Sequence, residues 1–182
     1  MKMPLTRLAC PVHLMGDGQP TKARKRRVKM TKHAVLKQLE GLTFAAKGDS
    51  NHWVMMDGPT SVGGTDAGSR PKELVLYALA GCTASDVISI LKKKRVPLHG
   101  FEMHLTGHEA EDHPKVFTDI HVEYVFFGNE IDPADVERAI ELSTTKYCSV
   151  SAMLTPKVKI THSYRIEPVA ASTASNAEAM RD

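Results

Sequence analysis

Two cysteines, Cys82 and Cys148, are the residues of this 182-residue chain best suited by type and setting to do chemistry. Cys82 follows a run of small residues, among them Ala78, Ala80 and Gly81, which leaves room beside its sulfur. Glycine inside a helix costs about 1 kcal/mol relative to alanine, so Gly81 indicates a packing or functional requirement. An intracellular cysteine is a nucleophile, a metal ligand or a small apolar filler, and at this point redox chemistry and inert packing both stay open.

The elements that must position these cysteines follow from the spacing of apolar residues. Strands are expected near residues 34–47 and 52–57, joined by a turn at 48–50. A glycine-rich loop at 58–70 follows, and Pro71 opens a helix that runs to about residue 95. Proline suits the first helical turn because its missing N–H needs no partner there. Cys82 therefore lies midway along a long helix.

The second half of the chain repeats the order of strands and helix. Alternating apolar residues at 101–105 and 120–126 predict a strand pair, and another alternation predicts a last strand at 158–166. Between them, Asp132 and Pro133 begin an amphipathic helix, and Cys148 follows it at a helix end or in a loop. The order ββα-ββα-β predicts the α+β class.

The expected first helix is apolar nearly all round from residue 74 to residue 91. A helix without a polar face must be buried on every side. A few strands in a domain of this size can hardly surround it, so the pattern predicts a homodimer in which a second copy covers the remaining face.

Charge is distributed unevenly along the chain. Residues 1–33 carry nine Lys or Arg and one Asp, which gives this segment a charge of +8. Because the formal net charge of the whole chain is +3, the remaining residues carry −5. We expect residues 1–30 to be a basic leader, disordered or not translated, because Met30 is a plausible start. Residues 31–168 form the folded domain, and residues 169–182 are small and polar and predict a disordered tail. The acidic body has no basic stripe with aromatics, which argues against a nucleic-acid partner.

Composition excludes several further classes. No uninterrupted apolar run reaches the roughly 20 residues that cross a bilayer, so no membrane partner is expected. Three cysteines are too few for a disulfide scaffold, which favours a cytoplasmic location. Four histidines between residues 104 and 121 lack the spacing of a metal site, so neither a metal nor another cofactor is expected.

Two segments carry a family resemblance. Residues 70–74 (RPKEL) leading to 80–83 (AGCT), and residues 147–151 (YCSVS), resemble the two cysteine motifs of the OsmC/Ohr superfamily. The variant after Cys82 is similar to the OsmC-like branch, and the resemblance covers roughly residues 31–167. It implies an OsmC-like fold, in which an antiparallel sheet packs with a long buried central helix, and an intertwined homodimer with sites at the subunit interface.

The resemblance also implies a function, that of a thiol-dependent hydroperoxide reductase in oxidative stress defence. By position, Cys82 would be the peroxidatic thiol and Cys148 the resolving thiol, and a dithiol reductant would reopen their disulfide. Glu73 matches the acidic residue that stands shortly before the peroxidatic cysteine. The implied partners are a hydroperoxide substrate, the reductant and a second copy of the chain.

The chain departs from the family in the group that activates the thiol. Only the thiolate is nucleophilic, and the family lowers the thiol pKa with an arginine from an early strand or loop. Residues 34–69 contain no Arg. Lys47, Arg70 and Lys72 are the candidates to replace it, and the sequence does not choose among them.

A second departure concerns Asp86. It lies four residues after Cys82, on the same face of the expected helix, where an unpaired carboxylate would raise the thiol pKa. The alternative to a peroxidase is therefore a catalytically weak OsmC-like protein that binds a small molecule in the same pocket.

Overall fold

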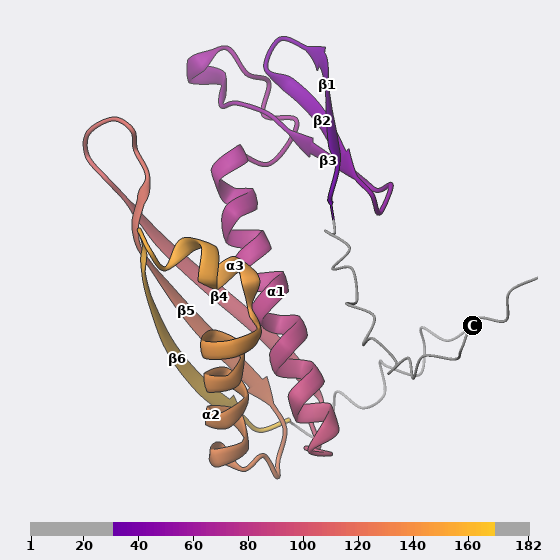
Figure 1. Ribbon diagram of the computed structural model, residues 1–182, viewed down its shortest axis with the longest axis vertical. Coiled ribbons are helices and arrows are strands. Elements are labelled where there is room, and N and C mark those ends of the chain that lie inside the picture. The colour runs from indigo at the N-terminus through magenta and orange to yellow at the C-terminus, as the bar shows by residue number, and fades with distance from the viewer. Residues whose placement is uncertain (1–30, 170–182) are drawn as a thin grey trace, which may run out of the picture. The chain divides into compact units, whose positions relative to one another are not determined.

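The structure is a computed structural model that describes residues 31–169 (Figure 1). The expected leader, 1–30, and nearly all of the expected tail, 169–182, lie outside the described residues, and the domain boundaries stay a prediction. All helices and strands belong to one compact unit that begins at Ala34.

The first three strands form an antiparallel sheet in the order β1-β2-β3. Their bounds are Ala34–Glu40, Thr43–Gly48 and Trp53–Met56. The single strand expected at 34–47 is wrong, because the chain reverses at Gly41, whose φ of 51° suits glycine. The expected turn at 48–50 is confirmed, and the N–H of Asn51 closes it on the carbonyl of Gly48 at 3.0 Å.

Hydrogen bonds to one carboxylate organise the loop that follows, which contains a short 3-10 helix at Thr60–Val62. Asp57 is buried, and both of its oxygens accept hydrogen bonds. The hydroxyl of Thr65, foremost, and several backbone N–H groups hold the pKa of this carboxyl well below its usual range. The donors are the N–H groups of Gly58, Thr65 and Ala67 and the hydroxyls of Thr43 and Thr65.

The long helix α1 spans Pro71–Lys93, close to the prediction. Pro71 occupies its first turn, and the Glu73 carboxylate accepts a hydrogen bond from the N–H of Arg70, at 2.9 Å, which caps the N-terminus. Lys92 and Lys93 lie in the last turn, where positive charge suits the helix dipole.

The second sheet has the order β4-β5-β6, with bounds Gly100–Glu109, Phe117–Phe127 and Lys159–Glu167. β4 is antiparallel to β5, as expected, but β6 is parallel to β5, so the α+β class is confirmed while a wholly antiparallel sheet is not. Parallel neighbours need a crossover, and helices supply it. These are α2 (Pro133–Leu142), a π-helix (Ser143–Tyr147) and α3 (Ser149–Leu154).

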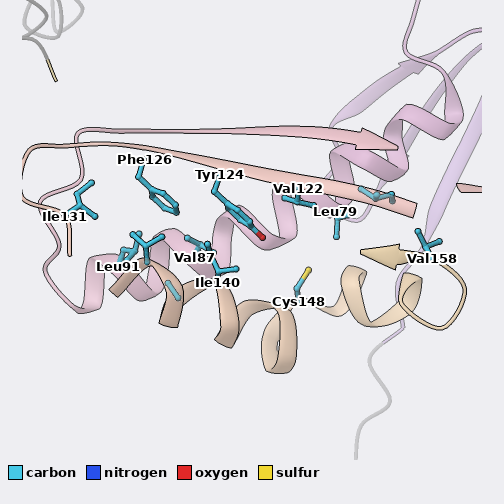
Figure 2. Packing of buried hydrophobic residues seen from close by; sticks show 13 residues of the cluster. Leu79, Val87, Leu91, Val122, Tyr124, Phe126, Ile131, Ile140, Cys148 and Val158 are labelled. Carbon is cyan, nitrogen blue, oxygen red and sulfur yellow. The ribbon is translucent and has the colours of Figure 1, made fainter. Parts of the chain in front are cut away.

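The core lies between the second sheet and the helices (Figure 2). Residues of β5 that share one face point toward α1 and α2 and are fully buried. Asp132 begins α2 as predicted, since its side chain accepts a hydrogen bond from the N–H of Ala134. The largest core side chains are Tyr124, Phe126, Leu79, Leu91, Ile120, Val87, Val122, Val125 and Val136.

Helix α1 is buried along a single stripe. Its four buried residues, Leu79, Thr83, Val87 and Leu91, recur at intervals of four and so lie on one face. Tyr77 is 53% exposed, and a Cβ added at Gly81 would meet nothing within 4 Å. Burial on every side is therefore not achieved within one chain.

By length and a mean hydropathy of 1.8, α1 could also cross a membrane, and 22% of that segment is buried within the chain. Core helices of folded domains pass the same test. α1 packs against α2, α3 and β4, which is the behaviour of a core helix.

Candidate functional site

The structure brings Cys82 and Cys148 together although they are far apart in the sequence. Cys82 lies in the middle of α1, and Cys148 is the N-cap residue of α3. Their sulfurs and a carboxylate oxygen of Asp86 all lie within 4.8 Å of one another. Both cysteines are free thiols, so two reduced sulfurs lie close together.

Cys148 is the buried member of the pair, with its side chain at the edge of the core (Figure 2). Its sulfur lies 3.3 Å from the hydroxyl of Thr83 and accepts a hydrogen bond from the N–H of Ser151, at 3.4 Å. Burial, followed by the neighbouring Cys82, raises the pKa of the Cys148 thiol despite these two contacts. Cys148 is therefore kept protonated.

Cys82 is half-buried, and its surroundings act in the opposite direction. Burial is the largest single influence and by itself raises the pKa of the Cys82 thiol. The N–H of Val150, the Cys148 thiol and the hydroxyl and N–H of Ser149 together outweigh it, so the pKa of Cys82 is lowered. The Ser149 hydroxyl lies 4.0 Å from the sulfur. Cys82 is thus the member of the pair that ionises first.

Asp86 has a partner of its own. The hydroxyl of Ser143, in the π-helix, donates a hydrogen bond to Oδ2 of Asp86 at 3.1 Å. The Asp86 carboxylate is therefore hydrogen-bonded rather than unpaired, and its residue is half-buried rather than exposed to solvent. It nevertheless stays within reach of both sulfurs.

Glu73 is not brought to the cysteines within this chain. It lies in the first turn of α1, and the hydroxyl of Tyr77 donates to its Oε2 at 3.4 Å. Nine residues at 1.5 Å each put it about 13 Å along the helix axis from Cys82. Its observed contacts are those of a helix cap, and its expected role at the thiol stays a prediction.

The three candidate activating bases each bind a group elsewhere in the described chain. The guanidinium of Arg70 also donates to the carbonyls of Asp57 and Gly68, at 3.3 and 3.1 Å. None of these contacts involves Cys82 or Cys148. Lys47 donates to Asn51 at 2.6 Å and lies over the Trp53 ring. Arg70 forms an ion pair with Asp66, and Lys72 forms one with Glu109.

The sequence does not reveal the groups that surround the sulfurs. It suggests a cationic side chain as the activating group, whereas the donors around Cys82 include a hydroxyl and backbone N–H groups at the start of α3. Thr83 and Ser149, each next to a cysteine in the sequence, were overlooked. Cysteine is not a usual N-cap residue, so the segment CSVS did not predict the helix that it begins.

Two pockets lie near the functional elements. One, of about 320 Å³, is formed along α1 and borders the cysteine pair through Asp86; Lys93, Lys94, Leu142 and Tyr147 also line it. The other, of about 500 Å³, exposes mainly apolar atoms, and Asp57, Arg70 and Lys72 line it together with Leu42, Phe44, Gly58, Pro59 and Pro71.

Comparison with known proteins places this arrangement in a family. The model of the family described as OsmC-like protein matches residues 64–163, which contain both cysteines and α1. The chain belongs to the OsmC-like protein family. The OsmC/Ohr resemblance inferred from the two cysteine motifs is thereby confirmed.

Relatives and solved structures agree with the OsmC-like assignment. Protein YhfA of Escherichia coli K12 is 42% identical over 133 residues, which are 73% of this chain and 96% of YhfA. A hypothetical protein of Aquifex aeolicus is 31% identical, with a TM-score of 0.69 over 78% of this chain and all of that one. An organic hydroperoxide resistance protein OsmC of Legionella pneumophila, at 14% identity, shares the fold with a TM-score of 0.58 over 76% and 98% of the two chains.

Proposed function

We propose that this chain is a thiol-dependent peroxidase that reduces hydroperoxides through Cys82 and Cys148. The observation that carries the proposal is the asymmetry of the pair. Cys82 is accessible and has a lowered pKa, whereas Cys148 is buried with a raised pKa beside it. A nucleophile that ionises readily and a protonated thiol within reach are what peroxide reduction by two cysteines needs. Organic hydroperoxide resistance proteins share this fold, which supports the substrate class.

The reaction balances with these two residues and an external reductant. The Cys82 thiolate attacks the distal oxygen of ROOH, the O–O bond breaks, and the leaving alkoxide takes up a proton as ROH. Cys82 is then a sulfenic acid. The Cys148 sulfur attacks it, an S–S bond forms, and water leaves with the Cys148 proton. A dithiol reductant returns two electrons and two protons by thiol–disulfide exchange.

The proposal includes a homodimer. Large apolar side chains are exposed on β1, on β3 and at Leu42 in the turn before β2, and β1 has no buried residue. Together with the exposed face of α1, they support a second copy of the chain as the cover. We further propose a cytoplasmic location, where a dithiol reductant keeps both cysteines free. The exposed side chains are Val35, Leu36, Leu39, Leu42, Trp53, Val54 and Met55.

Peroxide consumption by the reduced protein tests the function. Hydrogen peroxide and cumene hydroperoxide are supplied in parallel with dithiothreitol, and mass spectrometry follows the Cys82–Cys148 disulfide. Cys82→Ser should abolish consumption, and Cys148→Ser should stop turnover after the sulfenic acid forms. Cys10→Ser is the matched control and should behave as the parent protein. Consumption at the rate of a free thiol in all four proteins would overturn the proposal.

A second candidate function is supported by two features of the chain. The Asp86 carboxylate lies beside the sulfurs, where a negative charge disfavours a thiolate. The larger pocket, which is separate from the cysteine pair, exposes mainly apolar atoms. Both suit a catalytically weak protein that binds an apolar small molecule. That candidate predicts a co-purifying ligand whose affinity is unchanged by Cys82→Ser, whereas the peroxidase predicts loss of turnover in the same variant.

A further inference from the structure

The two sulfurs and the Asp86 carboxylate form a cluster of a kind that binds metal ions. Cys82 and Asp86 stand four residues apart on α1, so one helix face presents a thiol and a carboxylate together. Cys148 reaches the same place from the start of α3. We propose that Cys82, Asp86 and Cys148 of the reduced protein bind a thiophilic divalent cation, of which Zn²⁺ is the expected ion.

The geometry needs little adjustment. Zinc lies about 2.3 Å from thiolate sulfur and about 2.0–2.2 Å from carboxylate oxygen, so donors around one tetrahedral ion are roughly 3.3–3.8 Å apart. The three donor atoms here lie within 4.8 Å of one another, so closure requires a movement of about 1 Å. Three protein ligands leave the fourth position for water.

Neighbouring hydroxyls hold two of the ligands in place. Ser143 donates to Oδ2 of Asp86, which leaves Oδ1 for the ion, and Thr83 contacts the sulfur of Cys148. Such outer contacts orient metal ligands and commonly change affinity. The pocket of about 320 Å³ that borders Asp86 is an entry path for the ion.

The donor set decides which cations bind. Soft thiolates favour Zn²⁺ and Cd²⁺, whereas Mg²⁺ and Ca²⁺ prefer oxygen ligands. Binding displaces the protons of the two thiols and changes no oxidation state. Because a sulfur in a disulfide has no thiolate to offer, the cation and the Cys82–Cys148 disulfide exclude each other. This site does not depend on peroxidase activity.

The test uses the full chain in a Cys10→Ser background, so that the third cysteine of the sequence cannot contribute. The reduced protein is titrated with Co²⁺ as a spectroscopic probe and then with Zn²⁺ in competition. We expect one ion per chain, near-ultraviolet charge-transfer bands from thiolate to cobalt, and displacement by Zn²⁺. The disulfide form should give no bands, and Mg²⁺ should displace nothing.

Variants assign the ligands. Cys82→Ser and Cys148→Ser should each abolish the charge-transfer bands or halve them with a large loss of affinity. Asp86→Asn should weaken binding by at least about tenfold, and Ser143→Ala by up to about tenfold. Asp135→Asn, a carboxylate paired with Lys94, is the matched control and should bind as the parent does.

Several outcomes would overturn the site. These are an absence of thiolate–cobalt bands in the folded, reduced protein, equal affinity in Asp86→Asn and the parent, or binding that survives loss of both cysteines. Circular dichroism of each variant separates loss of a ligand from loss of the fold. Peroxide consumption measured with chelator present is a separate readout, so failure of the metal site and failure of the peroxidase are distinguishable.

Discussion

The two sheets of this chain have three strands each but differ in what covers their apolar side chains. In the second sheet, Val122, Tyr124 and Phe126 of β5 are at most 1% exposed beneath α1 and α2. In the first sheet, every residue of β1 is exposed, and Leu36 reaches 55%. Among the described residues, the chain therefore completes one core by itself and leaves the apolar side chains of β1 uncovered.

The difference shows what the spacing of apolar residues does and does not tell. Apolar residues recur at every second position in β4, β5 and β6, whereas β1 and β3 carry them at consecutive positions. The spacing of apolar residues predicts strands in both sheets. It does not say whether the covering surface comes from the same chain. Beside the first sheet, five hydrogen bonds to the buried carboxylate of Asp57 hold the loop that follows β3, and one of them comes from Thr43 of β2.

The largest expected effect is in the completed core. Phe126→Ala should lower the free energy of unfolding by about 3–5 kcal/mol, because it opens a cavity among fully buried side chains. Val116→Ala, at a position that is 54% exposed, should change it by no more than about 0.5 kcal/mol. Denaturant unfolding followed by circular dichroism measures both, and equal losses would contradict the assignment of the core.

A smaller effect is expected in the uncovered sheet, and it concerns association. Leu36→Arg should weaken the dimer by about 10- to 100-fold, since burying a leucine contributes about 1.5–3 kcal/mol. Val116→Arg is the matched control, because Val116 is equally exposed but joins β4 to β5. Sedimentation velocity across a range of concentrations measures the dissociation constants. If only Val116→Arg caused dissociation, the dimer contact would lie at the loop between β4 and β5 and not on the first sheet.

The thiol pair belongs to the completed region, and this can be tested separately. Ser149→Ala should slow alkylation of Cys82 at pH 6 by roughly two- to tenfold, because it removes one hydrogen bond that lowers the pKa of this thiol. Ser85→Ala, on the exposed face of α1, is the control. Leu36→Arg should leave the rate unchanged, since the donors to Cys82 come from its own chain. A rate that falls on dissociation would show that the partner activates the thiol.

The last prediction concerns the loop held by Asp57 and its dependence on acid. The folded-state pKa of Asp57 is lowered, so the folded state binds fewer protons, and the contribution is present above the unfolded value near pH 4 and is lost as pH falls below it. Asp57→Asn should remove this acid dependence and increase protease cleavage at residues 58–70. Limited proteolysis at pH 2 and pH 7 measures it, because the contribution is lost below pH 4, with Asp132→Asn as a control at an exposed cap. Equal cleavage in parent and variant would show that the loop does not need the carboxylate.

Much of the fold could be predicted from the sequence because its signals are local. Pro71 marks the start of α1, Asp132 caps α2, and alternation marks β4, β5 and β6. The pairing of β6 could not be predicted, because the direction of a strand depends on the path of the crossover before it. The reversal at Gly41 was missed because apolar residues continue through it.

The site was predicted in its two sulfurs but not in their surroundings. Family motifs identify Cys82 and Cys148, which the structure brings within 4.8 Å. The donors that separate their pKa values are backbone N–H groups and hydroxyls, and backbone groups leave no signature in a sequence. The position of Ser143 beside Asp86 depends on the π-helix, which has no simple residue pattern.

Because Cys148 is the N-cap residue of α3, its oxidation would affect the stability of this helix. The sulfur of Cys148 accepts the N–H of Ser151, and the same turn supplies the N–H groups near Cys82. A disulfide would draw this sulfur out of its capping position and leave an N–H without its acceptor. Amide hydrogen exchange in α3 should therefore become faster on oxidation, and the exchange rate of this short helix would report the redox state of the two cysteines.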